Sequence, residues 1–136
     1  MLAVKPIYDP ALREELCAHC GAASSPDLYA YFAADVTDDA AKINFIIGIC
    51  TFRMKGGENV ITELRCAPGV DDEEALMIMA RAVMNFMYRA GVENVTLNKA
   101  GVDQNTAKKL GFLELENMTI NLPEFYKAPC RYTGGK

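Results

Sequence analysis

The stretch from Asp71 to Ala90 constrains the fold of this chain more than any other. Its apolar residues recur every three or four positions and form one wide stripe, made of Leu76, Met79, Ala80, Val83, Met84 and Met87. Gly91 then ends the pattern, as glycine does after many helices. The stretch therefore predicts a long helix that buries one side against another layer of structure.

Runs typical of strands lie on both sides of this helix. The run Ile43–Arg53 is almost continuously β-branched and aromatic, which is typical of a central strand covered on both faces. The segment Lys55–Asn59 contains two adjacent glycines and predicts a hairpin turn. The strands that we expect are Leu2–Ile7, Leu28–Val36, Ile43–Arg53, Val60–Cys66, Val95–Leu97 and Leu113–Leu122.

Two shorter helices complete the predicted order. Asp9 before a proline favours a helix over Pro10–Cys20, and Gly111 stops a second one over Asp103–Leu110. The order β-α-β-β-β-α-β-α-β predicts an α+β fold, a mixed and mostly antiparallel sheet flanked by helices. No linker divides the 136 residues, so we expect one domain with its core in 28–122 and no clear pattern after Leu122.

Composition narrows the partners that we expect. The net charge is −4 and no basic run of five residues occurs, which argues against nucleic acid. No apolar stretch approaches the roughly 18 residues that a membrane span requires. An odd number of cysteines, five, fits a reducing compartment better than a disulfide framework, so we expect a cytoplasmic protein.

The segment Cys17-Ala18-His19-Cys20 has metal-binding residue types at close spacing. Zinc requires three or four protein ligands, and His19 is the only histidine of the chain. We therefore expect no metal site, and we interpret Cys17 and Cys20 as small, partly buried apolar residues. Metal binding and redox chemistry are the alternatives.

Several landmarks resemble one family. The strand end Leu64-Arg65-Cys66-Ala67-Pro68 is followed by the long helix, by the segment 91–97, and later by Lys109-Leu110-Gly111-Phe112. Over about residues 28–122 this pattern resembles the GNAT-type N-acetyltransferases. The resemblance implies their fold and a site for acetyl-CoA, whose pantetheine would pair with strand backbone near Leu64 to Cys66. It also allows a homodimer, a common state in the family.

The loop that would hold the coenzyme departs from the family pattern. The family places a basic residue and small residues before its helix, where backbone N–H groups cradle the pyrophosphate. Alignment puts Asp71 at the basic position and Asp72, Glu74 and Leu76 at small ones. Acidic side chains there would repel a pyrophosphate. Alternatively, Asp71 caps the helix with Glu74 as its capping-box partner.

The residues for catalysis match only in part. Glu63 occupies a position where some GNAT-like enzymes carry a general base; alternatively it pairs with Arg65 on a solvent face. Strict alternation would put Thr62 with Leu64 and Cys66 on the opposite face. The family's general-acid tyrosine position is Ala107, and nothing places Tyr88 or Tyr126 at the thioester.

These observations lead to two hypotheses of function. In the first, the chain has an acetyltransferase fold with impaired or lost acetyl-CoA binding and binds a small ligand or a protein. In the second, it is an active acetyl-CoA-dependent N-acetyltransferase with an atypical pyrophosphate loop. The resemblance assigns coenzyme contacts to Leu64, Cys66, Asp72, Glu74 and Leu76, and catalysis to Glu63.

Overall fold

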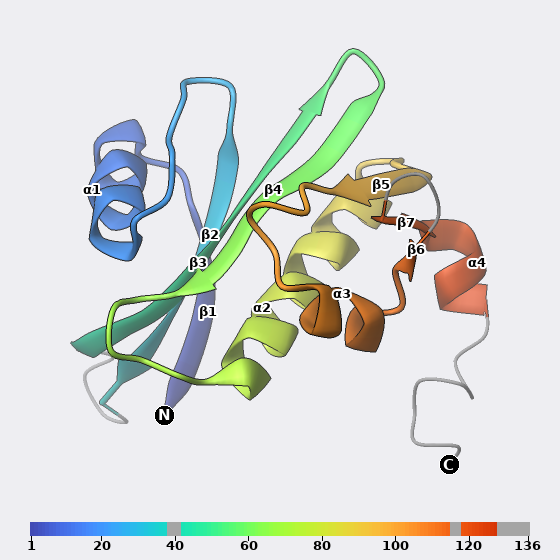
Figure 1. Ribbon diagram of the computed structural model, residues 1–136. Coiled ribbons are helices and arrows are strands. Elements are labelled where there is room, and N and C mark those ends of the chain that lie inside the picture. Colours follow the sequence, from blue (N-terminus) through green and yellow to red (C-terminus); the bar gives the residue numbers. More distant parts are fainter. Residues whose placement is uncertain (38–41, 115–117, 128–136) are drawn as a thin grey trace.

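The computed structural model describes residues 1–37, 42–114 and 118–127 (Figure 1). Seven strands form one sheet in the order β1-β2-β3-β4-β5-β7-β6. They span Leu2–Ile7, Tyr29–Val36, Ile43–Lys55, Glu58–Cys66, Asn94–Leu97, Leu113–Glu114 (β6) and Met118–Asn121 (β7). Neighbouring strands are antiparallel, except that β4 and β5 are parallel. The predicted mixed, mostly antiparallel sheet is confirmed.

Helices cover both faces of the sheet. They are α1 (Pro10–Cys20), α2 (Glu73–Arg89), α3 (Gln104–Leu110) and α4 (Leu122–Lys127). Figure 1 shows α1 on one side of β1–β4 and α2 on the other. The predicted stripe of α2 packs on Phe52, Ile61 and Leu64, whereas α1 packs on Ile49 and Ala67 through Leu16, Cys17 and Cys20.

Local chemistry explains where several elements begin and end. The Asp9 carboxylate accepts a hydrogen bond from Ala11 N at 3.1 Å and so caps α1. Gly56 and Gly57 have φ of 60° and 82°, which makes the β3–β4 connection a two-residue turn of type I′. The helix Pro10–Cys20 and the glycine hairpin are thus confirmed.

Two predictions about the extent and burial of strands were wrong. The segment predicted as one strand, Leu113–Leu122, contains two antiparallel strands, β6 and β7, and then the start of α4. Alternation of apolar residues does not reveal where a chain reverses. The second error concerns β3, whose first residues Ile43 and Phe45 are 47% and 51% exposed although we expected both faces to be covered.

An irregularity in β4 decides which side chains share a face. Thr51 lies opposite Glu63 and Phe52 lies opposite Ile61, so Thr62 is an extra residue in β4. Because of this bulge, Ile61 and Leu64 both face α2. Thr62 lies beside Glu63 instead of on the opposite face, and the strict alternation that we expected is broken here.

Candidate functional site

A polar hollow of about 340 Å³ lies beside the β4 bulge, under the loop that joins α1 to β2. Its volume is in the range of small-molecule sites. Ligands in such sites are oriented by a few polar groups, and this hollow offers several. Its lining consists of Ala23, Ser24, Ser25, Leu28, Arg53, Thr62, Glu63 and Asn98.

Glu63 ties β4 to the loop over the hollow. Its Oε2 accepts a hydrogen bond from Ala23 N at 2.7 Å, and its Oε1 lies 3.2 Å from Arg65 Nε. Arg65 in turn donates from Nη1 to Gly21 O at 2.7 Å. The predicted Glu63–Arg65 pair is present, but the loop covers it and leaves the Glu63 side chain only 15% exposed.

Arg53 forms another wall of the hollow. Its Nε lies 2.9 Å from Asp27 Oδ2, and Asp27 Oδ1 accepts a hydrogen bond from the Ser25 hydroxyl. These two hydrogen bonds, first that of Ser25 and then that of Arg53, hold the pKa of the Asp27 carboxyl below its ordinary value. Asp27 therefore stays charged at neutral pH and fixes Arg53 from one side.

The hollow ends where β4 and β5 separate. These strands pair only at Val60–Thr96 and Ile61–Leu97. Asn98 then donates from its backbone N to Ile61 O at 3.0 Å and from Nδ2 to Thr62 O at 3.4 Å. Asn98 thus connects the β5–α3 loop to the bulge of β4.

The β5–α3 loop occupies the edge of β4 beyond the last β5 pair. Leu64 N donates to Gly101 O at 3.0 Å, and the loop passes alongside β4 in Figure 1. A Cβ at Gly101 would lie 2.0 Å from Thr62 O, so only glycine allows this close approach. The backbone N–H of Leu64, at the position assigned to pantetheine pairing, is bonded within the chain.

The N-terminus of α2 is capped by its own side chain. Asp72, and not Asp71 as predicted, is the N-cap, and its Oδ1 accepts a hydrogen bond from Ala75 N at 3.0 Å. Because the helix begins one residue later than we predicted, its third residue is Ala75 and not Glu74. A capping box needs Glu or Gln at that third position, so the expected capping-box role of Glu74 is wrong. Glu73 instead pairs with Lys109 of α3 at 2.9 Å.

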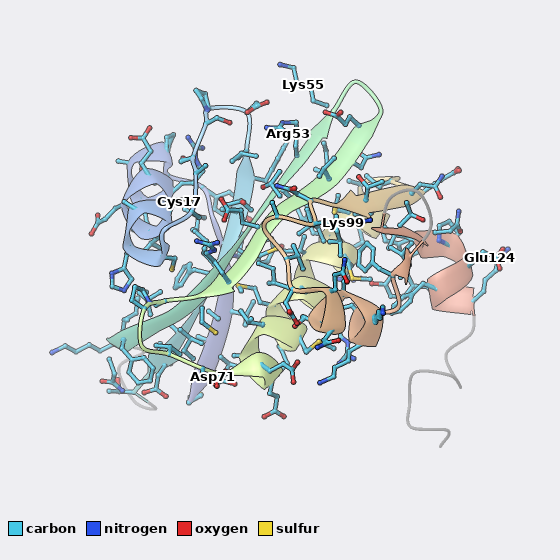
Figure 2. The ribbon with its side chains drawn as sticks, viewed as in Figure 1. Cys17, Arg53, Lys55, Asp71, Lys99 and Glu124 are labelled. Carbon is cyan, nitrogen blue, oxygen red and sulfur yellow. The ribbon has the colours of Figure 1, made fainter. Side chains whose placement is uncertain are left out.

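The remaining coenzyme-side residues lie near this cap. Cys66 Sγ lies 3.9 Å from Asp72 O, and Leu76 packs at the rim of the core on the α2 side. Glu74 is exposed. Cys66, Asp72 and Leu76 therefore lie on the α2 side of the sheet, whereas Glu63 points into the hollow on the other side. Figure 2 shows Arg53 and Asp71 toward opposite ends of the sheet.

The family's general-acid tyrosine position is occupied by Ala107, and the tyrosines Tyr88 and Tyr126 lie elsewhere in the described part of the chain. Ala107 is buried in α3 at 1% exposure. Tyr88 and Tyr126 stack on each other with ring centroids 4.6 Å apart. Tyr88 follows the cap residue Asp72 by 16 residues, or about 24 Å along α2 at a rise of about 1.5 Å per residue. The Tyr88–Tyr126 pair is therefore far from the cap.

The cysteines of α1, Cys17 and Cys20, pack as small apolar residues, as expected, but both are buried where we expected only partial burial. Burial raises the pKa of Cys17, and it raises the pKa of Cys20 to about 11. In the part of the chain that the structure describes, no group of three or more His, Cys, Asp or Glu side chains is arranged to hold a metal ion. The fifth cysteine, Cys130, lies outside the described residues. No helix within the described ranges has both the length and the apolar character of a membrane span.

Sequence reasoning missed four lining residues of the hollow, Ser24, Ser25, Thr62 and Asn98, as functional candidates. It also missed Arg53, for which a signal existed. Arg53 is the only charged residue in the run Ile43–Arg53, which is otherwise apolar or uncharged. A cation at the end of a buried strand requires a partner, and Asp27 supplies it.

Comparison by sequence found no match, either among models of protein families or among curated proteins. Comparison by structure found many. A chain of the KacTA–DNA complex has a TM-score of 0.62 at 15% identity and covers 93% of this chain and 97% of its own. An N-acetyltransferase from Staphylococcus aureus Mu50 has a TM-score of 0.60 at 10% identity, covering 90% and 98%.

A third similar structure, the NatC complex bound to Gag peptide and CoA, has a TM-score of 0.57 at 16% identity, covering 84% of this chain and 86% of its own. Further matching structures include the ribosomal-protein-S18-alanine N-acetyltransferase from Escherichia coli and an acetyltransferase of the GNAT family from Staphylococcus aureus Mu50. Identities this low report on the fold alone. The strand order, the parallel β4–β5 pair and these matches agree: the chain has the fold of the GNAT-type N-acetyltransferases.

Proposed function

We propose that this chain is a GNAT-fold protein with impaired or lost acetyl-CoA binding, and that it binds another small ligand in the polar hollow beside Glu63. The observation that carries the proposal is the hydrogen bond from Leu64 N to Gly101 O at 3.0 Å. Pantetheine would have to displace the chain's own loop from β4 before it could pair there.

The N-terminus of α2 is a second obstacle to the coenzyme. A pyrophosphate at a helix N-terminus is held by free backbone N–H groups and by the helix dipole. Here the Asp72 carboxylate already accepts from Ala75 N, and Asp71, Glu73 and Glu74 add negative charge around it. The residues present therefore fit coenzyme A poorly, and no reaction step is derived through it.

The hollow supports binding in a different place. It combines Arg53, Glu63, two serines, a threonine and an amide with apolar surface from Ala23 and Leu28. Ligand sites typically combine apolar surface with a few oriented polar groups. The Glu63–Ala23 hydrogen bond and the Arg53–Asp27 pair hold the rim in place before any ligand arrives.

The alternative is an active acetyl-CoA-dependent N-acetyltransferase, and one feature favours it. β4 and β5 separate after two residue pairs, so a movement of the β5–α3 loop alone would expose the edge of β4. Glu63 would then be the candidate general base on the opposite side of the strand, with Arg65 and Ala23 N as its present partners.

Thermal unfolding with and without 1 mM acetyl-CoA, a concentration chosen as about 100 times a Kd near 10 μM, tests the proposal. Such binding would add about 2.7 kcal/mol of stability and raise the Tm by several degrees. We expect acetyl-CoA to change the Tm by less than about 1 °C, which for a domain of this size corresponds to well under 1 kcal/mol. A rise of several degrees contradicts the proposal and supports the acetyltransferase.

A double variant distinguishes two obstacles to acetyl-CoA: the negative charge at the α2 N-terminus and the β5–α3 loop that covers the edge of β4. Asp72→Ser retains a capping oxygen and Glu74→Gln retains helix propensity, while together they remove two negative charges from the α2 N-terminus. If the loop on β4 is the main obstacle, this double variant also fails to respond to acetyl-CoA. A response would assign the obstacle to charge.

A further inference from the structure

We propose that the ligand of the polar hollow is a small carboxylate, held by the two Nη groups of Arg53. This inference rests on the proposed function for the place of binding and adds the chemical class of the ligand. The amine that the family resemblance implies as acceptor is a different class.

Arg53 is fixed on one side and open on the other. Its Nε donates to Asp27 Oδ2 at 2.9 Å, and this is the only hydrogen bond of the Arg53 side chain within the described ranges 1–37, 42–114 and 118–127. The side chain is 29% exposed and lines the hollow. The two Nη groups therefore present N–H donors in the flat fork that matches a carboxylate.

Asn98 adds one further donor to the lining, whereas the hydroxyls of Ser25 and Thr62 already donate to Asp27 and Thr51. Asn98 uses one proton of Nδ2 for Thr62 O and its Oδ1 for Ala100 N, which leaves one amide proton. The Ser24 hydroxyl accepts from Arg13 Nε at 3.3 Å and is also hydrogen-bonded to the Cys17 side chain, so it adds no free donor. A ligand rich in hydrogen-bond acceptors would bond to the remaining Asn98 amide proton and to the Arg53 Nη groups.

The acidic groups near the hollow are already occupied. Asp27 accepts from Ser25 and from Arg53 through its two oxygens. Glu63, the acid among the described lining residues, accepts from Ala23 N and lies 3.2 Å from Arg65 Nε. A cationic ligand would compete with these partners, whereas a carboxylate at Arg53 would meet unused donors.

Titration of the isotope-labelled chain with succinate, followed by the NMR signals of its backbone amides, tests the inference. Succinamide serves as the uncharged probe of the same shape. We expect saturable shifts for the amides of Ser24, Ser25 and Asn98 with succinate, and none that saturate with succinamide. Absence of saturation with succinate, or equal shifts with both probes, would overturn the inference.

Variants then identify Arg53 as the anchor. Arg53→Gln should weaken succinate binding by about tenfold or more, as expected for loss of a charge-assisted hydrogen bond. Arg81→Gln, on the exposed side of α2, serves as the charge-matched control and should leave the Kd unchanged. Unchanged binding in Arg53→Gln would overturn the assignment.

A second variant decides the matter if Arg53→Gln does not fold. Asn98→Asp keeps the oxygen that accepts from Ala100 N but puts a negative charge into the hollow. It should weaken succinate binding several-fold, and unchanged affinity would overturn the inference. Acetyl-CoA would instead shift the amides of Leu64 and Ala75, so failure of the proposed function is recognised separately.

Discussion

The two faces of β4 have opposite characters although their residues alternate along one strand. Toward α2, Ile61 and Leu64 join a dry core with the methionines of the helix. Toward α1, Glu63 and Arg65 hold a loop by charge and hydrogen bonds. The face toward α2 stabilises the fold through its packed core. The face toward α1 supplies charged and polar groups beside the hollow, where a ligand could contact them. Substitutions on the two faces should therefore differ in kind.

The largest effect should come from the dry core on the α2 side of the sheet, to which the neighbouring strand β3 contributes Phe52 beside Ile61 and Leu64 of β4. Phe52 is fully buried, with its ring centroid 5.5 Å from that of Tyr29 and 5.8 Å from that of Phe86. Phe52→Ala should lower the free energy of unfolding by about 3–5 kcal/mol, because it removes apolar contacts and leaves a cavity. Urea denaturation measures this loss. A loss below about 1 kcal/mol would mean that this face is not the stabilising one.

The next effect should come from the loop that closes the edge of β4. In Gly101→Ala the added methyl group would lie 2.0 Å from Thr62 O, so the loop must move away from β4. We expect a loss of about 1–3 kcal/mol, the cost of strain and of an unsatisfied buried donor. Hydrogen exchange of the Leu64 amide should become faster, because its acceptor is Gly101 O.

The neighbouring exposed residue supplies the control for that substitution. Ala100→Ser changes the same loop without adding atoms at the contact with Thr62. Its stability should stay within about 0.5 kcal/mol of the unmodified chain. If Gly101→Ala leaves the exchange of the Leu64 amide unchanged, the loop does not protect that N–H, and the main support for the proposed loss of coenzyme binding disappears.

A smaller effect should come from the polar face. Glu63→Gln keeps an oxygen that can accept from Ala23 N but removes the charge beside Arg65. We expect the free energy of unfolding to fall by about 1 kcal/mol, typical of a partly covered charged hydrogen bond. The exposed carboxylate Glu74 provides the matched control, because Glu74→Gln should change stability by less than about 0.5 kcal/mol. Equal effects of both variants would show that the loop contact does not stabilise the chain.

Much of the fold could be predicted from the sequence because its signals are local. The stripe of the long helix, Asp9 before Pro10 and the glycine pair at 56–57 each specify one element through its own residues. The resemblance to the acetyltransferases also rests on landmarks of this kind. The fold that follows from them agrees with the structure.

The candidate site could not be predicted in the same way because its contacts join distant segments. Glu63 meets Ala23, and Leu64 meets Gly101, only after the sheet has formed. The extra residue Thr62 in β4 interrupts the alternation of side chains between the two faces, and a pattern of period two in the sequence does not reveal such a bulge. The cap of α2 shows a different, local limit: the adjacent residues Asp71 and Asp72 satisfy the cap preference equally in sequence, and only the structure distinguishes them.

The smallest effect should be the dependence of stability on pH at the rim of the hollow. The hydrogen bonds from Ser25 and Arg53 lower the pKa of Asp27 below its ordinary value of 3.8. A lowered pKa in the folded state adds stability above the ordinary value, and this part is lost as the pH falls through the lowered pKa. Asp27→Asn should therefore flatten the loss of stability in acid, as measured by urea denaturation at a series of pH values below 5.

Asp35, whose pKa is lowered by Asn44 and the N-terminus, is the matched carboxylate away from the hollow. Asp35→Asn should reduce the acid sensitivity by a separate and additive amount, because the two groups share no partner. If Asp27→Asn leaves the acid profile unchanged while Asp35→Asn flattens it, the Arg53–Asp27 pair does not hold the rim. Arg53 would then be free to turn away from the hollow.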